Sequence, residues 1–369
     1  EDAADNLYAG IADKTTWNFT TTTGLSITIN QPNGGEKIQG GSSYNVNWKT
    51  TGNNIDHIHL LYSTDSGVTY SNEIVASTAD SGTYNWTVPE IDSDTVSVKA
   101  IAEDAGNNLL AEDESDADFT IDSIPPSKPI AASVTHKEDE CSSENDLLYF
   151  LWTDASDANG IAGYYYVLDR NPDTEPPDDS GNYTTSNSAS YGDVEDGSWY
   201  FHVRAVDNAG NLGETDHFGP VGIDTKSPDV PTLTAYTPDP TNNNKPELNW
   251  DDVVDDGCGD IEYKIQIDND SDFSSPLFDV TATESNYTPG EPLPEGTIYW
   301  HVKSIDEAGN ESDYSAVDDF TILGESISQL GLITSLQTIT TGQISDEMTI
   351  QTQDDEGNPV PVDEDTIVN

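Results

Sequence analysis

The chain has 369 residues, in which 70 Asp and Glu face only 12 Lys and Arg, giving a formal charge of −58. A negative charge of this size, spread along the whole length, excludes nucleic acid as a partner class and disfavours an anionic membrane surface. The length is too great for one ordinary β-sandwich and fits three or four modules of about 100 residues.

The composition predicts an all-β protein. Only 34% of residues are apolar and one is Met, while Thr, Ser, Asn, Gly and Pro are abundant. This mixture favours short strands joined by turns over helices. No stretch reaches the roughly 18 apolar residues of a membrane helix, so we expect no direct membrane insertion by this segment. No signal sequence opens the chain, and we expect Glu1 not to be a natural start.

Three consecutive units repeat the same order of predicted strands. The first, 24–122, has a strand around Trp48, and the strand TVSVKAIAEDAGNNL ends at Leu109. The second, 123–224, has LYFLWTD and then SWYFHVRAVDNAGNLG. The third, 225–323, has PELNWDD and then TIYWHVKSIDEAGNES. A repeat of this length predicts tandem β-sandwich domains. Pro-bearing connectors at 122–129 and 224–231 stiffen the linkers, so we expect an extended rod.

Each unit carries one Trp at the same strand position, and successive Trp residues are 104 and 98 positions apart. One large aromatic residue per domain is what packing between two sheets requires, so we interpret Trp48, Trp152 and Trp250 as core residues and not as ligand-stacking ones. Alternation along the second unit's long strand places Phe201, Val203 and Ala205 on one face. It places Tyr200, His202 and Arg204 on the other.

The motifs resemble those of known extracellular modules. Segments QPNGGEKI, YSTDSGVTY and GTYNWTVP within 31–122 resemble the Ig-like modules of microbial cell-surface proteins. Residues 125–322 are similar to the fibronectin type III-like and Ig-like repeats of bacterial adhesins and surface-layer proteins. The resemblance implies an extracellular location at the cell surface. It also implies that the partners are other copies or neighbouring domains of the same protein, with glycans as a further candidate.

The two ends look like incomplete domains. Residues 1–23 resemble only the last two strands of a bacterial Ig-like domain, and 324–369 resemble the first half of an invasin/intimin-like Ig module. We therefore expect the chain to be a segment of a longer protein. Further residues of that protein, or a neighbouring molecule, would complete the domains at both ends.

No catalytic motif is present. The chain lacks the G-x-S-x-G of serine hydrolases and the HExxH of zinc proteases,. Counting alone leaves a glycosidase carboxylate pair open, but short loops offer no deep groove for one. The histidines are scattered, and His202 and His301 occupy the same position in successive repeats, which favours a surface or packing role over metal binding. We predict that the chain is not an enzyme.

One pattern of acidic residues predicts calcium. In a sandwich of this type the incoming linker, the B–C loop and the F–G loop meet at one pole, so their oxygens converge. The predicted ligands are Asp122, Asp154, Asp157 and Asp207 in the second unit, and Asp224, Asp251, Asp252, Asp255, Asp256 and Asp306 in the third. Ca²⁺ takes six to eight oxygens at about 2.3–2.6 Å, and the resemblance to repetitive adhesins implies calcium at domain junctions. The alternative is that each Asp only caps its turn, on a surface adapted to high salt.

Three functions compete. The first is a non-catalytic structural or adhesive segment of a large surface protein, such as a stalk, an adhesin shaft, or a surface-layer or filament component. The second is a set of accessory or carbohydrate-binding modules from a large secreted polysaccharide-active enzyme. The third is a binding module whose exposed aromatic residues, such as Tyr164 to Tyr166, stack on sugar.

The two cysteines, Cys141 and Cys258, are predicted to form a disulfide between adjacent domains. Cys141 falls in a loop at the pole where the chain leaves the second unit, and Cys258 falls in a loop at the pole where it enters the third. Two loops that face each other can bring the Cα atoms of the two cysteines to the separation of about 4.4–6.8 Å that a disulfide requires. An extracellular site is also oxidising. Closing so long a loop contributes about 4–5 kcal/mol in the chain-entropy model.

Thiol labelling tests this disulfide. Denatured but unreduced protein should show no reactive thiol, because both sulfur atoms are in the bond. The same protein after reduction should show two, and two before reduction would contradict the prediction.

Overall fold

The computed structural model describes residues 24–324, apart from 146, 179, 256 and 258, together with 329–332, 350–353 and 357–359. Every regular element in this part is a strand except one 3₁₀ turn, η1, at Ser180–Asn182. No described helix is long and apolar enough to cross a membrane. The predicted all-β class of tandem sandwiches is confirmed.

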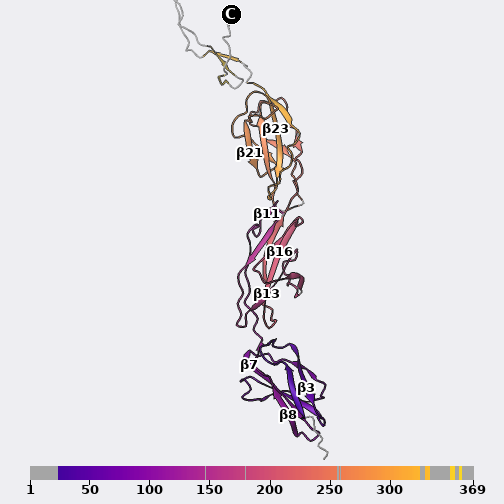
Figure 1. The fold of residues 1–369 in the computed structure, drawn as a ribbon. Coiled ribbons are helices and arrows are strands. Elements are labelled where there is room, and N and C mark those ends of the chain that lie inside the picture. Colours follow the sequence, from indigo (N-terminus) through magenta and orange to yellow (C-terminus); the bar gives the residue numbers. More distant parts are fainter. Residues whose placement is uncertain are drawn as a thin grey trace, which may run out of the picture. The chain divides into compact units, whose positions relative to one another are not determined.

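The first sandwich has a three-stranded and a six-stranded sheet around one core. The smaller sheet has the order β1 (Ser26–Gln31), β3 (Ser43–Thr51), β6 (Thr83–Thr87). The larger has the order β2 (Lys37–Gln39), β9 (Phe119–Asp122), β7 (Ser93–Glu103), β4 (His57–Ser63), β5 (Asn72–Thr78). The sixth strand, β8 (Leu109–Glu114), also pairs with β7 and lies beside it in Figure 1.

The strands that follow repeat this plan. One sheet has the order β10 (Ala131–Ser133), β12 (Leu148–Trp152), β15 (Ser188–Tyr191). Its companion has the order β11 (Cys141–Ser142), β17 (Asp216–Ile223), β16 (Gly197–Asp207), β13 (Ile161–Asp169), β14 (Tyr183–Thr184). The last sandwich has the order β18 (Leu233–Thr234), β19 (Leu248–Trp250), β22 (Asn286–Tyr287) in one sheet. The order in the other is β21 (Phe278–Ala282), β20 (Glu262–Asp268), β23 (Gly296–Ile305), β24 (Asp318–Ile322).

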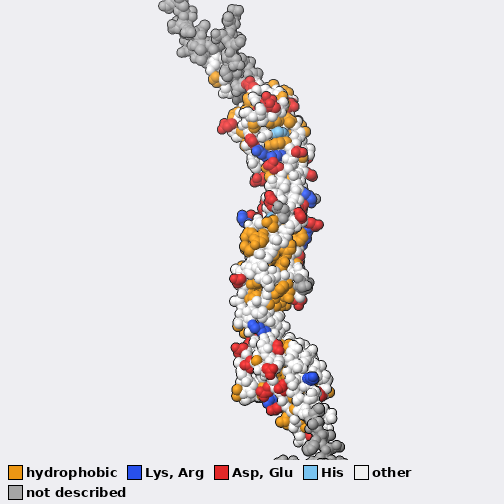
Figure 2. All heavy atoms as spheres, in the orientation of Figure 1, with side chains coloured by type: hydrophobic (Ala, Val, Ile, Leu, Met, Phe, Trp, Pro, Cys, Tyr) orange, Lys and Arg blue, Asp and Glu red, His pale blue; other side chains and the backbone are white. Residues whose placement is uncertain are grey.

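The chain divides into two compact units, each with most of its contacts inside itself. One comprises residues up to 132, 150–189 and 201–218, and the other comprises 133–149, 190–200 and 219 onward. The first unit holds the first sandwich, and the second holds the last one. Asp and Glu side chains are scattered over the face of the first sandwich drawn in Figure 2, with few Lys or Arg among them.

Each three-stranded sheet has its Trp on the central strand, as the repeat predicts. Trp48, Trp152 and Trp250 are 3%, 6% and 4% exposed. The indole of Trp152 stacks on Phe201 of the opposite sheet at 5.8 Å between ring centroids. The prediction that these three residues are buried in the sandwich cores is confirmed.

The exposure of two side chains bears on the predictions. His202, for which the sequence analysis left a surface or a packing role open, is fully buried, with the carbonyl oxygen of Asn171 and the ring of His217 beside it. Tyr164, expected to be available for stacking on sugar, is 4% exposed and packs edge-on against Trp152 at 5.6 Å. Alternation gives the face on which a side chain lies but does not say what covers that face.

The turn between β4 and β5 shows how acidic residues shape these loops. The Asp65 carboxylate accepts hydrogen bonds from Ser63 Oγ at 2.6 Å and from Thr69 N and Oγ1 at 2.8 and 2.7 Å. These hydrogen bonds lower the pKa of Asp65 to about 2. The carboxylate therefore stays ionised and holds the hairpin turn closed.

Most of the predicted terminal domains falls outside the described residues, including all of 1–23. Within 324–369, the described strands β25 (Gln329–Leu332) and β26 (Ile350–Gln353) pair antiparallel. The boundaries and the incompleteness of these end domains stay predictions.

Replacing the core Trp of the first sandwich should be costly. Trp48→Ala should lower the free energy of unfolding by about 3–5 kcal/mol, because it removes a large buried side chain and leaves a cavity. Val68→Ala is the control, since Val68 is 80% exposed and its loss should change stability by less than about 0.5 kcal/mol. Denaturant unfolding of both variants would measure this, and equal losses would contradict the core assignment.

Candidate metal centres

Two groups of three aspartates bring their carboxylates together. Asp122, Asp157 and Asp207 form cluster one, and Asp224, Asp255 and Asp306 form cluster two. In each group the nearest carboxylate oxygens all lie within 4.8 Å of one another. Each cluster lies within a single compact unit.

The strand plan places these side chains. In cluster one, Asp122 ends β9 and Asp207 ends β16, while Asp157 lies in the loop between β12 and β13. In cluster two, Asp224 directly follows β17, Asp306 directly follows β23, and Asp255 lies between β19 and β20. In both clusters, an Asp at the end of one sandwich therefore lies beside one Asp from the B–C loop and one from the F–G loop, the two loops that the sequence analysis selected.

A tight turn fixes the buried aspartate at the end of the long strand in cluster one. Asp207 Oδ1 accepts hydrogen bonds from the backbone N–H groups of Ala209, Gly210 and Asn211 at 2.8, 2.7 and 2.9 Å. Asn211 Nδ2 donates to Asp207 Oδ2 at 2.8 Å and to the carbonyl oxygen of Asp122 at 3.0 Å. One amide side chain therefore ties the preceding strand end to the turn.

Cluster two repeats the arrangement. Asp306 Oδ1 accepts from the N–H of Asn310 at 2.8 Å. Asn310 Nδ2 donates to Asp306 Oδ2 at 2.8 Å and to the carbonyl oxygen of Asp224 at 2.9 Å. The sequence shows the Asn in both repeats, but its bond to the preceding strand end was not predicted. The repeated spacing of four residues between Asp and Asn is the signal that could have indicated it.

The first sandwich carries a related turn with its Ala-Gly-Asn sequence shifted by one residue. Asp104 pairs with Asn108, again four residues on, with Asn108 N and Nδ2 donating to Asp104 Oδ1 at 2.9 and 3.0 Å. Asn107, with a φ of 59°, takes the left-handed position that Gly210 and Gly309 take in the other turns. Asn tolerates this conformation because its short polar side chain bonds locally.

Further groups support cluster one. Asn159 Nδ2 donates to Asp122 Oδ2 at 2.8 Å, and the N–H of Asn159 donates to Asp157 Oδ1 at 2.7 Å. The carbonyl oxygen of Asn159 accepts from Lys37 Nζ of the first sandwich. Asn159 therefore orients two of the three carboxylates, although the sequence analysis did not select it.

Some predicted ligands do not join the clusters. Asp154 is exposed and accepts instead from Asn187 Nδ2 at 2.7 Å. Asp251 and Asp252 are exposed and lie outside the three-aspartate group, and Asp256 lies outside the described residues. Residue type alone does not show which acidic side chains of a loop join a cluster.

The carboxyl groups of cluster two repel one another. Burial raises the pKa of Asp255, and the neighbouring carboxyls of Asp224 and Asp306 raise it further. Asp224 and Asp306 are only 1% and 5% exposed. The backbone also closes tightly around the group, since a Cβ at Gly257 would lie 1.7 Å from Asp224 Oδ2.

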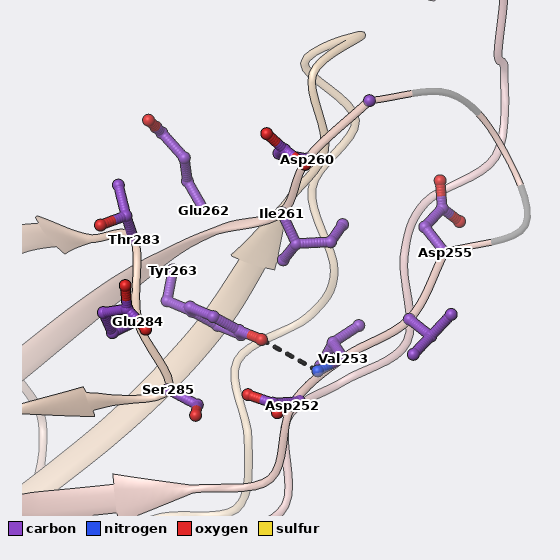
Figure 3. Close-up of a pocket in the computed structure, with 12 residues that line it drawn as sticks. Asp252, Val253, Asp255, Asp260, Ile261, Glu262, Tyr263, Thr283, Glu284 and Ser285 are labelled. Carbon is purple, nitrogen blue, oxygen red and sulfur yellow. Dashed lines mark hydrogen bonds between the residues drawn. The ribbon is translucent and has the colours of Figure 1, made fainter.

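An acidic hollow of about 490 Å³ opens beside cluster two (Figure 3). Five carboxyl groups line it, from Asp252, Asp255, Asp260, Glu262 and Glu284. At its inner side the hydroxyl of Tyr263 accepts from the N–H of Val253 at 2.9 Å. In the preceding repeat the hydroxyl of Tyr164 accepts from the N–H of Ala155 at 3.1 Å. A buried Tyr thus holds the acidic loop in both repeats.

The donor set fits a hard cation. Both clusters offer carboxylate oxygens and no imidazole or thiolate, which suits Ca²⁺ and Mg²⁺ over Zn²⁺ or Cu²⁺. Asp207 Oδ1 already accepts three N–H groups, but Oδ2 accepts only from Asn211 Nδ2. With about two acceptor positions per carboxylate oxygen, Oδ2 can still bind a cation. Loops that can adjust and a variable ligand number favour Ca²⁺ over Mg²⁺, which requires near-ideal octahedral geometry.

Of the two predicted disulfide partners, Cys141 on β11 is disulfide-bonded. Cys258 lies outside the described residues. The pairing of Cys141 with Cys258 stays a prediction, and the thiol labelling described above tests it.

Comparisons with known proteins concern the fold. No family model and no curated protein matches the chain. The fibronectin(III)-like modules of Clostridium thermocellum CbhA match 54% of this chain and 95% of their own, with 18% identity and a TM-score of 0.33. The FN1–FN3 domains of chicken CNTN1 match 81% of this chain and 98% of their own, with 13% identity and a TM-score of 0.28. A run of domains from titin matches 81% and 99%, with 14% identity and a TM-score of 0.33.

Asp255→Asn should change stability in opposite directions with and without calcium. The raised pKa of the Asp255 carboxyl means that the folded state binds its proton more tightly than the unfolded state does. Without divalent cations this group therefore costs stability as pH rises above its ordinary value of 3.8,. At pH 7 the Asn variant should be more stable than wild type in EDTA and less stable in CaCl₂, where a ligand is lost. Melting curves in the two buffers measure this, and a shift of the same sign in both would contradict a cation at cluster two.

Proposed function

We propose that the chain is a non-catalytic structural or adhesive segment of a large extracellular surface protein, with calcium bound at clusters one and two. In this proposal each ion joins the end of one sandwich to the loops of the next repeat. Its partners are further copies or neighbouring domains of the same protein. Tandem fibronectin-like and Ig-like sandwiches fit such a structural or accessory role.

The observation that supports the proposal most strongly is repetition. Clusters one and two use the same three structural positions, the same Asp-to-Asn turn and the same Asn bond to the preceding strand end. Asp residues that only capped their turns would need no second and third carboxylate. In both groups those additional carboxylates come from other segments of the chain.

Charge repulsion makes a bound cation favourable. Two carboxylate charges within 4.8 Å of each other repel by about 3 kcal/mol or more at an effective dielectric constant of 20, and each cluster contains three such pairs. A divalent cation replaces this repulsion with attraction to every ligand. The overall charge of −58 also concentrates cations near the surface.

The expected affinity is modest. Extracellular calcium modules have dissociation constants of about 10⁻⁴–10⁻³ M, so 1 mM calcium is about one to ten times the constant and fills about half or more of each site. At this concentration the ion stabilises the folded state by about 0.4–1.4 kcal/mol per site. Filling each cluster should therefore raise the melting temperature of the unit that contains it.

Thermal unfolding with and without calcium tests the proposal. Wild type should melt higher in 1 mM CaCl₂ than in NaCl of matched ionic strength, because specific ligation adds to charge screening. Asp207→Asn and Asp306→Asn should each remove part of this gain, since each deletes a buried ligand of one cluster. Asp154→Asn and Asp252→Asn are matched controls, because these exposed residues lie on the loops that carry Asp157 and Asp255 but outside the clusters.

The controls separate specific sites from general acidity. Equal melting temperatures in the two salts would overturn calcium binding and leave only a high-salt surface. Equal losses from all four variants would show that calcium acts on total charge and not on the clusters. The structural role itself would be contradicted by hydrolytic activity of the purified chain on polysaccharides.

A further inference from the structure

His202 is a buried histidine held in a fixed orientation. It lies on β16, between β13 and β17 in the sheet, and β13 and β16 lie side by side in Figure 1. Its side chain is 0% exposed. His202 Nε2 lies 3.0 Å from the carbonyl oxygen of Asn171 and 3.4 Å from Asp169 Oδ1. Both neighbours are acceptors, so Nε2 carries the proton.

This tautomer leaves the other ring nitrogen with a lone pair. Burial lowers the pKa of His202, so the ring is neutral near pH 7 and its Nδ1 is an acceptor. His217 Nδ1 on the neighbouring strand β17 lies 2.7 Å from it. His217 is exposed, whereas His202 is fully buried, so the pair lies where the buried sheet meets the surface.

We propose that His202 and His217 form a two-histidine site for a divalent transition-metal cation such as Ni²⁺, Cu²⁺ or Zn²⁺. Nδ1 of each ring is a ligand, and water completes the coordination. The cation takes the place of the hydrogen bond between the rings. The proton of His217 moves from Nδ1 to Nε2, so both rings stay neutral and no proton is lost overall.

The spacing is close to what a metal requires. Two metal–nitrogen bonds of about 2.0–2.1 Å place the nitrogens about 2.9 Å apart at a right angle and about 3.3 Å apart at a tetrahedral angle. The pair at 2.7 Å need open by only a few tenths of an ångström. Rotation of the exposed His217 ring allows this and also turns its lone pair toward the ion, while His202 stays in place.

The surroundings of His202 match those of a metal ligand. A histidine that binds metal usually donates its second N–H to a carboxylate or a backbone carbonyl, which fixes the ring and increases its basicity. Asp169 and the carbonyl of Asn171 supply both kinds of acceptor. Arg204, two residues along the same face, pairs with Glu175 at 3.7 Å, which reduces its repulsion of a cation.

The next repeat supplies an internal comparison. His301 occupies the same strand position as His202, but its ring is stacked between Phe273 and Tyr314, at 3.8 and 3.9 Å between centroids. His301 Nε2 lies 2.9 Å from Gln266 Oε1. Among the described residues, the ring contacts of His301 are thus with Phe273 and Tyr314 and not with a second imidazole.

Nickel binding to the whole chain tests the site. Isothermal titration with NiCl₂, in buffer containing CaCl₂ to occupy the carboxylate clusters, should show one site per chain. His217→Tyr and His217→Asn should each weaken binding at least tenfold, and Asp169→Asn should weaken it about tenfold. His301→Asn is the matched control and should bind like wild type.

A second readout locates the ion. Substoichiometric Cu²⁺ should broaden the ring proton signals of His202 and His217 before those of the other four histidines. If the His217 variants bind Ni²⁺ as tightly as wild type, or if Cu²⁺ broadens all six histidines alike, the pair is a hydrogen-bonded packing contact and the proposal is wrong.

Discussion

The bond between an Asp at the end of a long strand and an Asn four residues later is the interaction on which the rest of this chain depends. The Asp carboxylate accepts the N–H groups of the turn, and the Asn amide reaches back to the carboxylate and onward to the preceding strand end. This network closes the turn and ties it to the end of the preceding strand. It also places a buried negative charge at the pole where three segments meet.

That placement creates an electrostatic problem within each unit. Asp207 and Asp306 are almost fully buried, and each has two further carboxylates within 4.8 Å. Burying charge without compensation is costly, and amide donors such as Asn159 and Asn310 compensate only in part. Calcium would resolve the repulsion, and the same oxygens that strain the apo form would then hold the strand end. We therefore regard stability and cation binding as properties of one structure.

The fold could largely be predicted from the sequence, for identifiable reasons. The repeat spacing of Trp48, Trp152 and Trp250 reports a packing requirement that every sandwich shares, and all three are buried. Six of the ten predicted calcium ligands meet because strand ends and loops at one pole follow from the topology. Asp154, Asp251 and Asp252 do not join them, because the local path of a loop depends on hydrogen bonds such as that from Asn187 to Asp154. The histidine pair was missed because His217 lies 15 residues from His202 and no periodic pattern connects them.

The central claim is that clusters one and two are calcium sites, and native mass spectrometry of the whole chain tests it most directly. In solution that contains 1 mM CaCl₂, the calcium-bound forms of the chain should extend to two ions more than those of the double variant Asp207→Asn, Asp306→Asn. A broad distribution of ions that is the same in both proteins would contradict the account, because it would show that the aspartates attract calcium only as part of a general acidic surface.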